Sequence, residues 1–131
     1  MLPAWTYDSG RSALYTYVTH DGGRTWSATP PIALDQGLGS PIFEPSFVSP
    51  TSWFMWSTSG QLAATTDAGQ TWSIFRPAGV ARSPVLALEF TSASEGWACN
   101  GDSWSGPVTC TDPLYRTADG GRTWTLILSN R

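Results

Sequence analysis

Short runs of apolar and β-branched residues alternate along the chain with turns rich in glycine, proline and serine. Runs of this kind are typical of β-strands, because aromatic and β-branched side chains pack well on a pleated surface. The last third of the chain gives the clearest example, with predicted strands at residues 85–90, 96–100, 114–117 and 123–128. No stretch has the length and periodicity of an amphipathic helix. The pattern therefore predicts an all-β fold.

Two earlier stretches repeat this arrangement of strands. The middle stretch predicts strands at residues 44–48, 53–57, 62–65 and 71–75. The first stretch predicts strands at residues 4–7, 14–19 and 25–28. No residue before Met1 is present to form a strand ahead of these three. We thus expect three related sets of antiparallel strands, the first without its innermost member.

One eight-residue motif stands between the last two predicted strands of each set. It occupies residues 19–26, 65–72 and 117–124, and its aspartates are 46 and 52 residues apart. Five of the eight positions are identical in all three copies, giving T-x-D-x-G-x-T-W. The shared residues are Thr19, Asp21, Gly23, Thr25 and Trp26, then Thr65, Asp67, Gly69, Thr71 and Trp72, then Thr117, Asp119, Gly121, Thr123 and Trp124. Such internal repetition is typical of folds built from stacked units.

Each copy of the motif has the composition of a β-hairpin turn. The aspartate carboxylate can accept backbone N–H bonds across the turn, and glycine tolerates a positive φ that other residues resist. The threonines and the tryptophan suit the ends of the joined strands. A calcium loop is disfavoured, because the motif lacks the closely spaced acidic ligands and closing glutamate of such loops. The motif predicts a structural turn and no metal site.

These residues resemble the BNR, or Asp-box, repeat of sialidases, sortilin-type receptors, xyloglucanase-like hydrolases and photosystem II assembly factors. The resemblance implies β-propeller blades of four antiparallel strands, in which each box joins the third and fourth strands at the rim. It also implies that the boxes are scaffold and lie away from the ligand-binding face. The run from Phe90 to Trp124 is similar to photosystem II stability-factor-like proteins, which are exported platforms for protein partners.

On this repeat, the chain is a single partial propeller over residues 1–131, with about three blades. We expect the blades at about residues 1–30, 42–76 and 84–129, the first lacking its inner strand. Propellers typically close with 4–8 blades, and an open arc exposes apolar blade faces. Further blades of a longer chain would complete the circle, an alternative that the incomplete first blade favours. The other alternative is a homo-oligomer in which several copies form one ring.

The loops of the expected ligand face supply the candidate binding residues. They join the second and third strands within a blade, or lead from one blade to the next. The spacing from Trp5, Trp53 and Trp97 to the next box threonine is 14, 12 and 20 residues, so the third blade carries an extra loop. The candidate binding residues are Arg11, Arg76, Arg82, Asp102 and Trp104.

Cys99 and Cys110 bracket most of that extra loop. In so small a chain the pair suggests a disulfide, and hence an extracytoplasmic or secreted protein, although the first residues show no signal peptide. A disulfide would stiffen the loop and any binding surface on it. The alternative is two buried free thiols.

Charge and composition disfavour several other classes of function. The net charge is −3, and the seven basic residues are arginines scattered singly, so a nucleic-acid partner is not expected. No apolar run approaches the roughly 18 residues of a membrane-spanning helix. Two cysteines and the distant His20 cannot form a four-ligand zinc site, and we expect neither metal nor cofactor.

Two hypotheses for function follow from the resemblance. The first is a non-catalytic recognition or assembly scaffold for a protein or carbohydrate partner. The second is a segment of a sialidase-like or xyloglucanase-like glycoside hydrolase, in which Arg11, Arg76 and Arg82 would bind a substrate carboxylate. The Y/F-R-I-P signature of sialidases is absent and no pair of carboxylates stands out, which favours the scaffold. A protease-like segment around Ser103 lacks a base, because His20 lies in a box.

Overall fold

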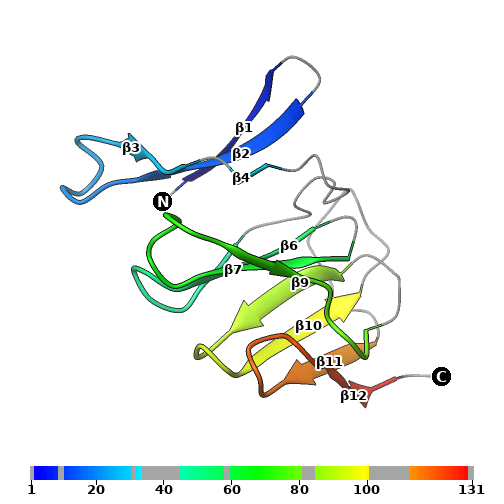
Figure 1. The fold of residues 1–131 in the computed structure, drawn as a ribbon. Helices are drawn as coiled ribbons and strands as arrows, with labels where there is room; N and C mark the ends of the chain where they lie inside the picture. The colour runs from blue at the N-terminus through cyan, green and yellow to red at the C-terminus, as the bar shows by residue number, and fades with distance from the viewer. Residues whose placement is uncertain are drawn as a thin grey trace.

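The computed structural model describes residues 2–8, 11–30, 32–33, 45–57, 60–80, 85–100 and 113–129, and these contain no helix. Within these residues, twelve strands form three antiparallel sheets that follow one another along the chain (Figure 1). The all-β fold is therefore confirmed.

The first sheet is built around a long hairpin. Its strands are β1 (Leu2–Asp8), β2 (Arg11–Val18), β3 (Ser27–Ala28) and β4 (Ile32–Ala33). Both β3 and β4 pair with β2, so together they form one outer edge with an interruption. Within the interruption, Thr29 N–H still donates to Thr16 O at 2.7 Å, whereas Pro30 has no N–H to donate. β4 lies beyond the last strand that the sequence predicts for this set.

The second and third sheets each contain four strands in chain order. The second consists of β5 (Ser46–Phe47), β6 (Trp53–Trp56), β7 (Leu62–Thr65) and β8 (Ser73–Phe75). The third consists of β9 (Val85–Phe90), β10 (Gly96–Asn100), β11 (Leu114–Thr117) and β12 (Thr125–Leu128). Residues 62–65, 85–90, 96–100 and 114–117 form strands over their predicted ranges. This is the four-stranded antiparallel architecture of propeller blades.

The outer strands begin two residues later than the sequence predicts. Their predicted first residues are Thr25, Thr71 and Thr123. Their observed first residues are Ser27, Ser73 and Thr125. In each box, the N–H and the hydroxyl of the second shared threonine both donate to the aspartate. This threonine therefore belongs to the turn, and the strand starts after it.

The strand register corrects the predicted equivalence of Trp53 with Trp5 and with Trp97. Trp5 pairs with Leu14, five residues before its box threonine. Trp53 pairs with Thr65, whereas the residue that pairs with Thr117 is Gly96. Gly96 thus takes the place of Trp53, and a Cβ there would meet the ring of Phe90 at 2.8 Å. Since neighbouring residues of a strand face opposite sides, the one-residue offset puts Trp97 on the other face of its sheet.

The hydrophobic core lies between the second and third sheets. Phe54 and Phe90 stack with ring centroids 3.6 Å apart, and Trp124 meets Phe90 and Trp56 edge to face. Phe90 N–H also donates to the buried Ser46 Oγ at 2.7 Å, which joins β9 to β5. The buried members of the cluster are Phe54, Trp56, Leu62, Phe90, Ala98, Tyr115 and Trp124. These contacts pack the two sheets together as neighbouring blades.

Candidate functional site

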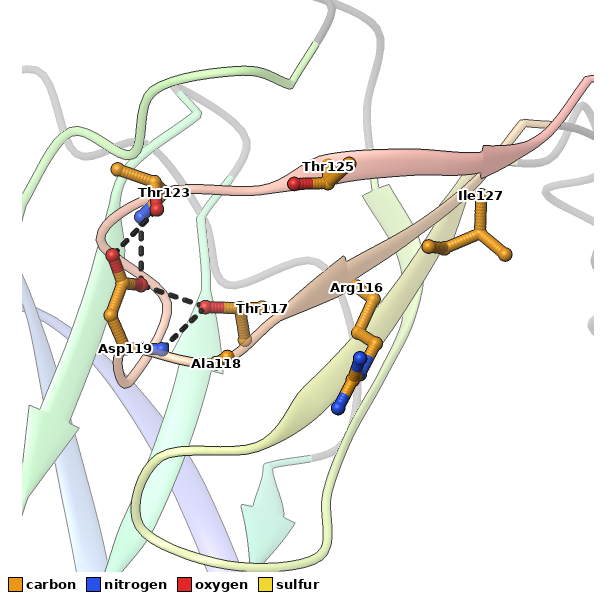
Figure 2. A pocket seen from close by; sticks show the side chains of 7 residues that line it. All are labelled: Arg116, Thr117, Ala118, Asp119, Thr123, Thr125 and Ile127. Carbon is orange, nitrogen blue, oxygen red and sulfur yellow. Dashed lines mark hydrogen bonds between the residues drawn. The ribbon is translucent and has the colours of Figure 1, made fainter.

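The third box shows how each of these turns is closed (Figure 2). Asp119 Oδ1 accepts from Thr117 Oγ1 and from Thr123 N–H, both at 2.9 Å, and Oδ2 accepts from Thr123 Oγ1 at 2.5 Å. Thr117 Oγ1 in turn accepts from Gly121 N–H at 3.0 Å. Trp124 Nε1 donates to Gly121 O at 2.8 Å, which fixes the indole against the turn.

The first and second boxes repeat these bonds around Asp21 and Asp67. In every box both carboxylate oxygens accept hydrogen bonds from within the turn. All of these bonds join residues no more than four positions apart. Both oxygens of each carboxylate thus serve as hydrogen-bond acceptors that close the hairpin.

Hydrogen bonding keeps the box aspartates ionised. The bonds from the Thr25 hydroxyl and N–H lower the pKa of Asp21 from 3.8 to about 2, and those from Thr123 lower the pKa of Asp119 to about 2. The pKa of Asp67 is lowered in the same way. A carboxyl group held in its charged form is a poor general acid near neutral pH.

We expect the fold to lose stability as the pH falls from 3.8 toward about 2. The pKa of Asp21 and Asp119 is lower in the folded chain than its ordinary value, so ionised boxes stabilise the fold above pH 3.8. Protonation removes this contribution as the pH approaches the folded value. Thermal unfolding followed by tryptophan fluorescence should show Tm falling through this window. An Asp119→Asn variant should have a lower Tm at neutral pH and a flatter pH dependence, and an unchanged profile would contradict the prediction.

The fifth residue of the second box, and that of the third, contacts the sheet that precedes it. A Cβ at Gly121 would collide with Leu62 of β7, and one at Gly69 would lie 3.1 Å from Thr16 Oγ1 of β2. Leu62 and Thr16 each stand three residues before the first threonine of their own box. The second and third boxes therefore connect successive sheets through equivalent positions.

A groove lies beside the third box, which we call the inter-sheet groove. From the second sheet and its box it is lined by Ala64, Thr66, Thr71, Ser73 and Phe75, among others. From the third box it is lined by Asp119, Gly120 and Arg122. A second concavity, the end hollow, lies on the face of the third sheet shown in Figure 2. Its lining includes Arg116, Ala118, Thr123, Thr125 and Ile127.

Of the candidate binding residues, Arg76 has a described side chain. It is exposed, follows β8, and its Nη1 lies 3.7 Å from the position of a Cβ on Gly60, just before β7. The loop that leaves the outer strand therefore meets the β6–β7 loop, as expected for two loops of one face. Arg11 opens β2, and its side chain lies outside what the structure describes. Outside the described residues lie Arg82, Asp102 and Trp104.

The predicted pairing of Cys99 with Cys110 stays a prediction. Cys99 is 2% exposed and is not a free thiol, while Cys110 lies outside the described residues. In the described part of the chain, no group of three or more His, Cys, Asp or Glu side chains could hold a metal ion. The same residues include no helix of the length and apolar character needed to cross a membrane.

Two arginine–aromatic contacts were not singled out from the sequence. Arg122 Cζ lies 4.7 Å from the ring centroid of Phe75 in the preceding sheet, and Arg116 Cζ lies 6.0 Å from that of Trp97. Arg116 also donates to Glu95 Oε1 at 2.5 Å. Arg116 and Trp97 are direct cross-strand partners, so a correct register would have paired them. Arg122 and Phe75 belong to different sheets, and sequence spacing carries no signal for them.

Comparison with known proteins agrees with the repeat and the fold. The model of the BNR/Asp-box repeat matches residues 17–28, which contain the whole of the first box. No curated protein sequence matches the chain. The structure of YCF48 bound to D1 peptide is similar with a TM-score of 0.63 and 20% sequence identity, covering 92% of this chain. The chain spans 36% of the length of that protein. It therefore carries the BNR/Asp-box repeat, and its blades have the fold of part of YCF48.

Proposed function

We propose that the chain is a non-catalytic propeller segment that binds an extended stretch of a protein partner. The observation that carries this proposal is the fold shared with YCF48, whose structure holds a D1 peptide. A blade scaffold with a peptide-binding role needs rigid hairpins and exposed loops rather than reactive side chains. The three boxes supply the rigidity, because each is closed by its own hydrogen bonds.

The loop face around Arg76 is the proposed contact surface. Arg76 is exposed beside Gly60, where two loops meet. A guanidinium group there can donate charge-assisted hydrogen bonds to a peptide carboxylate or carbonyl. The sequence also places Arg11 and Arg82 in or next to loops of this kind. The proposed partner is therefore a peptide with an acidic side chain or a free carboxyl terminus.

Most of the described carboxylates are engaged in hydrogen bonds or an ion pair, which supports a role without catalysis. A glycoside hydrolase needs two facing carboxyl groups, one of which gives up a proton. The carboxylates of Asp21, Asp67 and Asp119 are engaged in their turns. Glu95 is paired with Arg116. We accordingly expect no hydrolysis of fluorogenic sialosides or xyloglucan oligosaccharides, and turnover of either substrate would favour the hydrolase instead.

Replacing Arg76 with alanine is expected to weaken peptide binding about tenfold, the usual effect of losing one charge-assisted hydrogen bond. The probe is a fluorescently labelled D1 peptide of the kind present in the YCF48 structure. Fluorescence anisotropy would give Kd for the wild-type chain and for the variant. Arg24→Ala is the matched control, because Arg24 is exposed but belongs to a box. Equal loss in both variants would contradict the loop face, and no binding by the wild-type chain would contradict this partner.

A further inference from the structure

The first box is a second copy of the element that forms one wall of the inter-sheet groove. Residues 119–124 read D-G-G-R-T-W, and residues 21–26 have the same six letters. The third box seats on the second sheet through three contacts. Gly121 lies against Leu62, Arg122 lies over the ring of Phe75, and Trp124 meets Trp56.

No such contact covers the first box within the described residues. Trp26 is 42% exposed, whereas its counterpart Trp124 is 4% exposed. A Cβ at Gly23 would meet only the indole of Trp26, at 3.7 Å, whereas one at Gly121 would collide with another sheet. The exposed face of the first box is therefore the face that the third box buries.

The end hollow is equivalent to the surface of the second sheet against which the third box packs. Five residues of the second sheet and its box, among others, line the inter-sheet groove. The equivalent residues of the third sheet and its box lie 52 positions later in the chain, and these line the end hollow. Ala64, Thr66, Thr71, Ser73 and Phe75 correspond to Arg116, Ala118, Thr123, Thr125 and Ile127. Leu62, which meets Gly121, corresponds to Leu114. Ile127 is 53% exposed, so the hollow presents apolar surface that no described residue covers.

We propose that copies of this chain associate head to tail, with the first box of one copy seated in the end hollow of the next. The exposed face of the first box then packs against the end hollow, as the third box packs against the second sheet. Such a contact joins two different surfaces, so it generates a ring or an open array according to whether the rotation closes. The occupant of the end hollow is thus a second copy of this chain.

Charge fits this seating as well as shape. In the inter-sheet groove, Asp119 and Ala64 line the same space. Their counterparts across the proposed contact are Asp21 of one copy and Arg116 of the next, so the Asp21 carboxylate would approach a guanidinium group that Glu95 of its own chain also contacts. Arg24 would lie over Ile127, as Arg122 lies over Phe75. Opposite charges at an interface favour the correct pairing and speed association.

Sedimentation equilibrium of the full chain tests the association. We expect a mass that rises with concentration in a range reaching about 100 μM, because small interfaces are typical of weak association. Ile127→Lys should raise Kd at least about tenfold, because the new ammonium group would face Arg24. The matched control is Leu126→Lys. Leu126 is the neighbouring residue of β12, is 50% exposed, and points to the opposite side of the strand. This control should associate like the wild-type chain.

A gain-of-function variant and a compensating double variant keep the test independent of folding defects. Ile127→Phe installs the residue found at position 75 and should tighten association about threefold through a cation–π contact with Arg24. Arg24→Glu combined with Ile127→Lys should recover association that Ile127→Lys alone loses. A wild-type chain that stays monomeric over the whole range would overturn the proposal. So would equal weakening by Ile127→Lys and Leu126→Lys. Circular dichroism of each variant would confirm that its fold is intact.

Discussion

Replacing Trp124 with alanine is expected to lower the free energy of unfolding by about 3–5 kcal/mol. The side chain is 4% exposed and lies in the core between the second and third sheets. Its ring contacts Phe90 and Trp56, and its Nε1 donates to Gly121 O at 2.8 Å. Alanine removes these contacts and leaves a cavity that the surrounding rings cannot fill. Urea denaturation followed by circular dichroism would measure the change.

Trp26→Ala is the matched control for this variant. Trp26 has the same place in its box and the same bond from Nε1 to a glycine carbonyl, but it is 42% exposed. We expect it to cost about 1 kcal/mol in dilute solution, mainly for the lost hydrogen bond from Nε1 to Gly23 O. The difference between the two variants isolates the packing of one sheet against the next. Equal losses would show that the tryptophan acts only within its own turn.

Gly121→Ala is expected to lower the free energy of unfolding by about 3 kcal/mol, from backbone strain and overpacking together. Gly121 has a φ of 87°, in the left-handed region, and a Cβ there would collide with Leu62 and lie 3.3 Å from the Phe90 ring. Denaturant midpoints of the variant and the wild-type chain would measure the loss.

Gly22→Ala separates strain from collision. Gly22 has a φ of 73° but no atom within 4 Å of its Cβ position, so we expect a cost of about 1 kcal/mol, for strain alone. The second box already carries alanine at this position, since Ala68 has a φ of 58°. Adding Leu62→Ala to Gly121→Ala should cost less than it does in the wild-type chain, because it makes room for the new methyl group. Strict additivity of the two substitutions would contradict the collision.

The contrast between Gly121 and Gly22 explains why one position of the motif is glycine in all three boxes and the other is not. The fourth position reads Gly, Ala and Gly in the three boxes, because its surroundings are open in the first box and alanine is accepted in the second. The fifth position is glycine in all three. In the second and third boxes this residue combines a positive φ with close approach to the preceding sheet. A positive φ alone favours glycine but accepts alanine, as Ala68 shows. A positive φ together with close packing against the preceding sheet requires glycine.

Local features were predictable from the sequence, and contacts between sheets were not. Every bond that closes a box lies within four residues, so the motif itself specifies the turn. The stack of Phe54 on Phe90 and the contact of Arg122 with Phe75 join residues 36 and 47 positions apart. No periodicity in the sequence marks such pairs. The match of Trp53 with Trp97 was wrong because it aligned residue types, whereas the pairing with the box threonine sets the register.

The candidate site was predictable only in part. Arg76 was chosen for its place in a loop, and the structure brings it beside Gly60 of a second loop. Arg122 and Arg116 have more clearly defined surroundings, yet they were passed over because one lies within a box and the other within a strand. Loop position is thus a useful guide to exposure, but it says little about which side chains are held in place by aromatic rings.

The outer edge of each sheet has a consequence for behaviour at high protein concentration. β3, β8 and β12 comprise two, three and four residues, and the edge formed by β3 and β4 is broken at Pro30. A growing fibril recruits strands along long, unbroken rows of free amide and carbonyl groups. Edges this short offer poor templates for such growth, so a chain rich in β-structure and exposed tryptophan can avoid fibril growth by strand pairing while its blades are folded.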